Sequence, residues 1–152
     1  MGPKIKRNPL YISVYLLAAS YFFGEFIFPK YNLFYLINIF GIMGLIISTI
    51  FFISAFNLFS SYNENPRPST ESKKLIKTGI FAYTRNPIYI SFVLFHFSMF
   101  LTFENVANLL SAIGLFIWTN HYVIPIEERY LQEKFGNEYD RYLLAVKKWM
   151  FF

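Results

Sequence analysis

Residues 33–59, LFYLINIFGIMGLIISTIFFISAFNLF, decide the class of fold. This stretch contains no charged side chain, and an α-helix of about 20 apolar residues crosses the roughly 30 Å hydrocarbon core of a bilayer. The chain as a whole is also apolar, since 55% of its 152 residues are hydrophobic and only 15% are charged. A soluble domain of this size carries more charge. The sequence therefore predicts an integral membrane protein.

Three further apolar segments lie at residues 10–28, 88–103 and 106–124. The segment at 88–103 is short, but it has no charge and can begin with Pro87 as its first helical residue. The sequence predicts one all-α membrane domain over residues 1–152, with four transmembrane helices at 10–28, 33–59, 88–103 and 106–124. A cytosolic connector at 60–87 and a cytosolic tail at 125–152 complete this domain.

Positive charge predicts the orientation of these helices. Of the 14 Lys and Arg residues, all except Lys30 lie in the N-terminal tail, the connector or the C-terminal tail. Lys and Arg concentrate in cytoplasmic loops of membrane proteins. Both termini are therefore expected in the cytoplasm, in a multi-pass protein whose short loops suit a bacterial inner membrane.

The connector and the tail have local patterns of their own. Turn-forming residues open the connector, and a short helix is predicted at residues 70–77, ended by Gly79. The tail shows apolar residues at helical spacing and predicts an amphipathic helix at the membrane interface. A break is predicted at Gly136, with Asn137 capping a second helix.

Several classes of function are excluded by composition. Cysteine is absent and only two histidines occur, so no metal site is expected. The basic residues flank apolar segments and form no stripe with aromatics, so no nucleic-acid partner is expected. His96 is predicted to donate a hydrogen bond between helices, and Glu25 to extend toward Lys30.

Polar residues gather where two helices meet the cytoplasm. Arg85, Asn86 and Pro87 open the third helix in the stretch YTRNPIYIS (residues 83–91), and Glu127 and Glu128 follow the fourth. Consecutive helices usually pack as neighbours, so the two groups are expected to face each other across one cytosolic cleft. A simpler interpretation is that Arg85 anchors the helix end and that the glutamates begin a solvated surface helix.

Two ordered motifs surround this helical hairpin: KTGIFAYTRNPIYIS at residues 77–91, and EERYLQEKFGNEYDRYLLAVKKW at residues 127–149. Together they resemble the isoprenylcysteine carboxyl methyltransferase and phospholipid methyltransferase superfamily of integral membrane enzymes. The signature of that family runs G-x-Y, R-H-P-x-Y-x-G, a helical hairpin, E-E and F-G-x-x-Y-x-x-Y. The resemblance covers about half of the chain.

The resemblance implies methyl transfer from S-adenosylmethionine to a lipophilic acceptor, such as a prenylcysteine-like carboxylate, a phospholipid amine or a small thiol. It also implies the residues of the site. The catalytic candidates are Arg85, Asn86 and Glu128, and the cofactor-binding candidates are Leu75, Ile76, Gly79, Phe81, Asn86, Pro87, Ile88, Tyr89 and Glu127. His121 is the candidate for substrate binding. The expected partners are a lipophilic small molecule and the bilayer.

The chain departs from the family pattern at four places. Asn86, Phe81 and Ser91 replace the histidine, the tyrosine and the final glycine, and Val123 stands where several relatives carry an arginine. Asparagine cannot titrate, so it cannot act as a general base.

Two other functions remain open at this stage. One is an NADPH-dependent reductase similar to sterol reductases, although its P-N-Y-x-x-E element lacks the acid here, where Phe92 stands. The other is a non-catalytic helical membrane scaffold.

Overall fold

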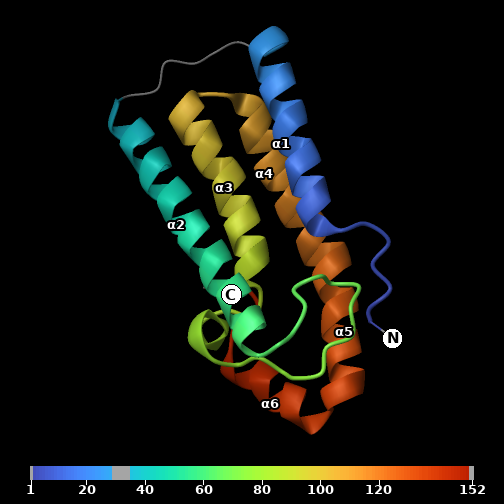
Figure 1. Cartoon of the computed structure of the whole chain (residues 1–152). Helices are drawn as coiled ribbons and strands as arrows, with labels where there is room; N and C mark the ends of the chain where they lie inside the picture. The colour runs from blue at the N-terminus through green and yellow to red at the C-terminus, as the bar shows by residue number, and fades with distance from the viewer. Residues whose placement is uncertain (1, 29–34, 151–152) are drawn as a thin grey trace.

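A computed structural model describes residues 2–28 and 35–150, and all regular structure in this part of the chain is helical (Figure 1). The α-helices are α1 (Pro9–Phe26), α2 (Tyr35–Ser61), α3 (Pro87–Phe103), α4 (Val106–Trp118), α5 (Ile124–Phe135) and α6 (Asn137–Ala145), with a 3₁₀ turn η1 (Gly79–Ala82) and a π-helical turn η2 (Thr119–Val123). The four predicted apolar helices are therefore present. Residues 33 and 34, at the predicted start of the second, lie outside the described part.

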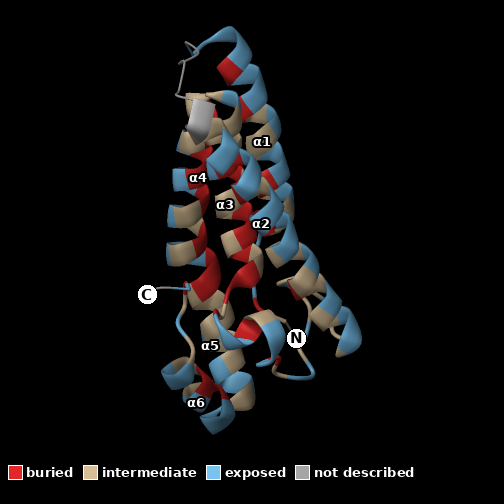
Figure 2. Ribbon diagram, turned by 90° about the vertical axis from the view of Figure 1, so that its left-hand side faces the viewer, coloured by how far each residue is buried: buried red, intermediate tan, exposed pale blue. Residues whose placement is uncertain are grey.

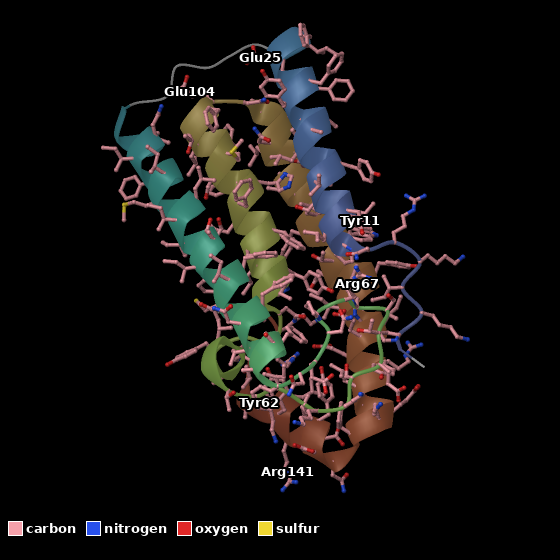
Figure 3. The ribbon with its side chains drawn as sticks, viewed as in Figure 1. Tyr11, Glu25, Tyr62, Arg67, Glu104 and Arg141 are labelled. Carbon is pink, nitrogen blue, oxygen red and sulfur yellow. The ribbon has the colours of Figure 1, made fainter. Side chains whose placement is uncertain are left out.

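Helices α1 to α4 run side by side, and α5, α6 and the connector gather at one end of this bundle (Figure 1). Helix α3 packs on both α2 and α4, whereas α1 packs mainly on α4. We call the end that holds α5, α6 and the connector the cleft end. The side chains of Glu25 and Glu104 lie at the opposite end (Figure 3).

Helix starts follow from local chemistry. Asn8 caps α1 because its side-chain oxygen accepts a hydrogen bond from the Leu10 amide at 3.0 Å, and Pro9 occupies the first turn. Pro87 begins α3, as predicted, and its missing amide hydrogen leaves no donor unsatisfied there.

The bundle buries small polar side chains and exposes large apolar ones, the opposite of the usual distribution in a soluble protein. Small polar side chains are buried between the helices, whereas large apolar side chains such as Phe40, Ile46 and Ile50 of α2 are exposed. Exposed residues form outward faces along the helices, and buried ones face the bundle axis (Figure 2). An apolar surface of this extent needs lipid around it.

Two helices are long and apolar enough to cross a membrane, Ile37–Ser61 and Val106–Phe135. The apolar helix Pro87–Phe103 is shorter. The chain thus has at least two candidate membrane spans among the residues that the structure describes.

Small residues let α2 and α3 approach closely. A methyl group added at Gly44 would lie 2.2 Å from the Ser98 hydroxyl, and one added at Gly41 would lie 2.4 Å from the Thr102 hydroxyl. Glycine and serine at such positions allow the van der Waals contact that holds helices together in lipid.

His96 joins three helices, as the sequence predicts. It is fully buried on α3, where its Nε2 lies 3.1 Å from the Ser13 hydroxyl of α1 and its Nδ1 lies 2.8 Å from the Ser111 hydroxyl of α4. The predicted approach of Glu25 to Lys30 falls on a residue outside the described part.

Replacing His96 by Ala should destabilise the bundle, because the buried hydroxyls of Ser13 and Ser111 each lose a hydrogen bond to the ring and a void forms between α1, α3 and α4. The Ser111 hydroxyl keeps its bond to the Asn108 carbonyl. We expect a loss of about 1–3 kcal/mol in the free energy of unfolding, measured by thermal unfolding in detergent. Ser98→Ala is the control, since that side chain is equally buried but adds no bond to α1. An equal midpoint for H96A and wild type would contradict this role.

Helix α4 does not end at the predicted boundary near residue 124. It continues through η2 into α5, so that residues 106–135 form one helix of 30 residues. Pro125 lies in this helix, where a proline ring would clash with the carbonyl four residues earlier. The wider π-helical turn immediately before it makes room for the ring.

Two other local predictions were wrong. Residues 70–77 form no helix, because their backbone groups bond to distant side chains; the Lys73 amide donates to both carboxylate oxygens of Glu64 at 3.0 Å. Gly79 begins η1 instead of ending a helix. Gly136, with φ of 49°, takes the cap position of α6, and Asn137 is its first helical residue.

Candidate functional site

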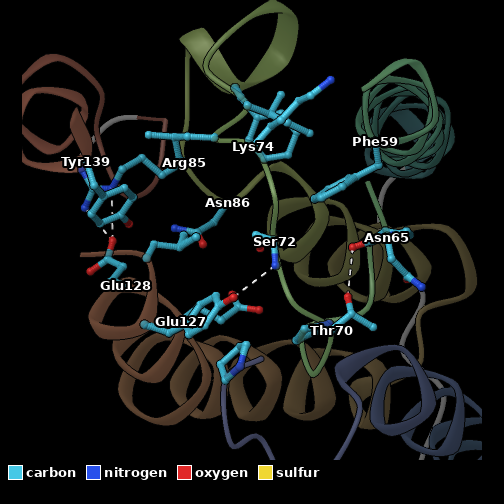
Figure 4. Close-up of a pocket in the computed structure, with 18 of the residues that line it drawn as sticks. Phe59, Asn65, Thr70, Ser72, Lys74, Arg85, Asn86, Glu127, Glu128 and Tyr139 are labelled. Carbon is cyan, nitrogen blue, oxygen red and sulfur yellow. Dashed lines mark hydrogen bonds and ion pairs between the residues drawn. The ribbon is translucent and has the colours of Figure 1, made fainter. Parts of the chain in front are cut away.

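A cleft lies at the end of the bundle that holds α5, α6 and the connector (Figure 4). Its walls are the connector, the start of α3, and the helices α5 and α6. It holds about 760 Å³ of space, part of it open to solvent. Its lining combines aromatic rings with charged groups and the backbone of the connector. The residues are Pro3, Phe59, Asn65, Pro66, Arg67, Pro68, Thr70, Ser72, Lys74, Leu75, Ile76, Phe81, Arg85, Asn86, Glu127, Glu128, Tyr130, Leu131, Tyr139 and Tyr142.

Arg85 and Glu128 form an ion pair on one side of the cleft (Figure 4). The Arg85 Nε and Nη2 atoms donate to the same Glu128 oxygen at 3.0 and 2.8 Å. The remaining guanidinium nitrogen donates to the carbonyls of Leu143 and Val146. Arg85 therefore connects the start of α3 to α5 and to the end of α6.

The segment after α6 folds back onto the start of α3. The carbonyl of Lys148 accepts hydrogen bonds from the Thr84 hydroxyl and the Asn86 side-chain amide, both at 3.0 Å. The Trp149 indole is buried and donates to the Asn120 side chain at 3.0 Å. Asn86 is thus held in the cleft by the C-terminal segment.

Glu127 differs from Glu128 in its partner. The Tyr89 hydroxyl donates to Glu127 Oε1 at 2.9 Å, and Glu127 has no cationic partner among the described residues. The side chain is half-buried and lines the cleft. A half-buried carboxylate without a cation is unfavourable, and either protonation or the positive charge of a ligand relieves it.

Two tyrosines of α6, Tyr139 and Tyr142, line the cleft. Burial raises the pKa of Tyr139 above its usual value, and the charge of Glu128 raises it further. Burial also raises the pKa of Tyr142, against the opposing effect of Arg85. Both hydroxyls therefore stay neutral at physiological pH, and the Tyr142 hydroxyl donates to the Phe81 carbonyl at 2.7 Å.

One hydrogen bond and two ion pairs join the connector to α5 and α6. The Ser72 amide donates to the Tyr130 hydroxyl at 3.1 Å (Figure 4), and ion pairs join Lys77 to Glu138 and Glu71 to Lys134 at 2.6 Å. The Lys134 ammonium, through its hydrogen bond and charge, holds the pKa of Glu71 below its usual value. These exposed pairs each contribute little, but together with the Ser72–Tyr130 bond they join the connector to α5 and α6.

The structure brings most of the predicted site residues together. The cleft is lined by the catalytic candidates Arg85, Asn86 and Glu128 and by the cofactor candidates Leu75, Ile76, Phe81 and Glu127. Pro87, Ile88 and Tyr89 follow directly on α3, but Ile88 and Tyr89 line a neighbouring groove. Gly79 lies at another hollow, where Leu58 lies within 2.7 Å of the position of an added methyl group.

His121, the substrate candidate, does not line the cleft. It lies exposed in η2, with the Asn120 side-chain amide 3.4 Å from its Nε2. Two departures from the family pattern also lie away from the cleft. Val123 is fully buried in the apolar core, and Ser91 donates to the Ile88 carbonyl of its own helix at 2.6 Å.

Sequence reasoning missed much of the connector side of the cleft. Phe59 lies near the end of an apolar helix, and residues 65–68 form an irregular, proline-containing segment, so neither has a sequence pattern that indicates a ligand. Tyr139 and Tyr142 do have a signal, since they lie three residues apart on one side of α6 and match the two tyrosines of the F-G-x-x-Y-x-x-Y signature. The apolar spacing of the tail predicts only an amphipathic helix at the membrane interface, and that prediction gave these tyrosines no role in the site.

Residues 35–138, about two thirds of the chain, match the phospholipid methyltransferase family. The chain belongs to the phospholipid methyltransferase family. The match spans α2, the connector, α3, α4, α5 and the first residues of α6, and so contains most of the cleft. Helix α1 and the residues before it lie outside the match.

A further comparison finds an uncharacterized protein of Haemophilus influenzae, which is 35% identical over 63 residues. That stretch covers 41% of this chain and all of the Haemophilus protein. No solved structure matches the chain. The family and the apolar helices together identify a membrane methyltransferase.

Proposed function

We propose that this phospholipid methyltransferase family member transfers a methyl group from S-adenosylmethionine to a lipophilic acceptor at the cytosolic face of the bilayer. In this proposal α1 to α4 all cross the membrane, and both termini are cytosolic, in a bacterial inner membrane. The charge distribution supports this orientation, since the N-terminal tail, the connector and the C-terminal tail carry all basic residues except Lys30.

The residues of the cleft fit S-adenosylmethionine, and the unpaired carboxylate of Glu127 is the observation that carries this proposal. The cofactor has an ammonium and a sulfonium group, and either one would supply the missing positive charge. Aromatic and aliphatic side chains, Phe59, Phe81 and Leu131, offer an apolar slot for the adenine.

When bound, the cofactor would supply an electrophilic methyl group together with a neutral thioether leaving group, held beside Glu127 and the apolar side chains of the cleft. The residues of the chain orient this transfer and exclude water from it. Arg85 and Glu128 act as positioning residues, because their bonds fix the start of α3 against α5. Asn86 can donate or accept a hydrogen bond but cannot remove a proton.

Calorimetric titration of purified protein in detergent tests the cofactor. We expect binding of S-adenosylhomocysteine and S-adenosylmethionine, and no binding of NADPH. Binding of NADPH alone would favour a reductase, and binding of neither cofactor class would favour a non-catalytic scaffold. A labelled methyl group should then appear in a lipid-soluble product of a total lipid extract, and its absence with every extract would contradict lipid methylation.

A further inference from the structure

A short N-terminal segment, residues 2–8, precedes helix α1 and lies outside the residues that match the family. It leaves the start of α1 and runs beside the connector (Figure 1). Its side chains alternate in burial, since Pro3 and Ile5 are buried whereas Lys4 and Lys6 are exposed. One face of the segment therefore packs on the rest of the protein, and the other face carries its charges.

Ile5 anchors this N-terminal segment. Its side chain is only 9% exposed and belongs to the apolar core cluster that also contains Tyr89 and Trp149. Three residues later, the side chain of Asn8 caps the start of α1. The segment is thus held to the domain at two points.

Pro3 brings the N-terminal segment into the cleft of the proposed cofactor site. It is buried, and it lines the same space as Asn86 and Glu127. A proline ring is a rigid apolar surface, because the ring fixes the φ angle of its own residue. Pro3 therefore adds an apolar contact to the cleft from outside the family match.

Gly2 lies directly against the connector. A methyl group added at Gly2 would lie 2.5 Å from the carbonyl oxygen of Thr70 and closer still to that of Ser69. Both of these oxygens belong to the backbone, so they can move away only if the connector itself moves. Glycine, which has no Cβ, permits this close approach.

The connector depends on such contacts for its arrangement. Its residues 65–72 form no helix or strand, and six of them line the cleft. One contact is the hydrogen bond from the Ser72 amide to the Tyr130 hydroxyl of α5 at 3.1 Å, and another is the approach of Gly2. An irregular loop with fewer contacts samples other arrangements, and a ligand binds only to the fraction of molecules with the correct one.

We propose that the N-terminal segment is part of the cofactor site: Gly2 and Ile5 hold the connector in its place in the cleft, and Pro3 contacts the bound cofactor. This inference rests on the proposed function and extends the site to residues outside the family match. Gly2 and Ile5 are positioning residues, since they act on the cofactor only through the connector and Pro3.

The affinity for S-adenosylhomocysteine, measured by calorimetric titration in detergent, tests this proposal. Gly2→Ala should weaken binding about tenfold, which corresponds to a connector that keeps its binding arrangement in only about a tenth of the molecules. Gly114→Ala is the matched control, because a methyl group at Gly114 meets nothing within 4 Å. G114A should bind as wild type does, and equal affinities of G2A and G114A would overturn the proposal.

Two variants of Ile5 separate positioning from general stability. Ile5→Ser removes the buried anchor and should weaken binding as G2A does, whereas Ile5→Val keeps a branched apolar side chain and should retain the wild-type affinity. Thermal unfolding midpoints without ligand show which variants are folded, and G2A should combine a wild-type midpoint with weakened binding. If I5V loses as much affinity as I5S, or if G2A loses affinity only in proportion to a lowered midpoint, the positioning role is wrong.

Hydrogen exchange of the connector separates this inference from the proposed function, because it needs no cofactor. The backbone amides of residues 67–73 should exchange faster in G2A and I5S than in wild type and G114A. If they do, and S-adenosylhomocysteine does not bind to wild type, the cofactor assignment fails while the hold of the N-terminal segment on the connector stands. If S-adenosylhomocysteine binds equally to all variants, or if exchange is the same in all of them, this inference fails alone.

Discussion

Arg85→Met should lower the free energy of unfolding by about 3 kcal/mol, because it leaves the Glu128 carboxylate without its cation. The two side chains are only 11% and 22% exposed, so water cannot fully replace the lost partner. The guanidinium also bonds to the carbonyls of Leu143 and Val146. Thermal unfolding in detergent should show a midpoint lower by roughly 10 °C for a chain of this size.

Two further variants make the test specific. Arg85→Met combined with Glu128→Met should recover part of the loss, because the unpaired carboxylate is removed along with its partner. Lys77→Met is the control, since it breaks the Lys77–Glu138 pair, whose side chains are 41% and 46% exposed, and should change stability by less than about 1 kcal/mol. An R85M midpoint no lower than that of K77M would contradict a structural role for Arg85.

Glu127→Gln should weaken S-adenosylhomocysteine binding about 10- to 100-fold, which is the range expected when a charge-assisted hydrogen bond loses its charge. The glutamine side-chain oxygen can still accept the hydrogen bond from the Tyr89 hydroxyl. The loss would therefore report on charge and not on the position of α3 against α5. Calorimetric titration of both proteins under the same conditions gives the ratio of affinities.

Glu133→Gln provides the matched control for this titration. It removes one negative charge from the same helix, but Glu133 is exposed and does not line the cleft. Its affinity for S-adenosylhomocysteine should equal that of wild type. If E127Q binds as tightly as E133Q, then the carboxylate of Glu127 does not hold the cofactor, and the observation that carries the proposed function is lost.

Local features of the sequence determined the helical framework. Long apolar segments predicted α1 to α4, and the predicted starts of α1, α3 and α4 lie within one residue of the observed ones. Pro87 and Gly136 marked a helix start and a helix break. These signals depend on hydropathy and on backbone stiffness at one residue, so they are readable without knowing what packs nearby. The motifs that surround the hairpin likewise indicated the family.

The backbone conformation of the connector depended on hydrogen bonds to residues distant in the sequence. Residues 70–77 have a composition that permits a helix, but the amides of Ser72 and Lys73 bond to Tyr130 and Glu64 in an irregular backbone. The passage of the helix through Pro125 likewise depended on the π-helical turn of residues 119–123. Neither arrangement follows from the local pattern, because each satisfies backbone groups through contacts that the pattern does not contain.

The sequence by itself determined that this protein is an apolar helical membrane protein, and it predicted that Arg85, Asn86, Glu127 and Glu128 face one cleft, which all four line. Only the tertiary structure decided their partners. It paired Glu128 with Arg85, left Glu127 facing the cleft with the Tyr89 hydroxyl, and brought the N-terminal segment to the same cleft. Neighbouring glutamates are equivalent in sequence, but adjacent residues of a helix point in different directions, and the helix packed against each one determines which charge is neutralised.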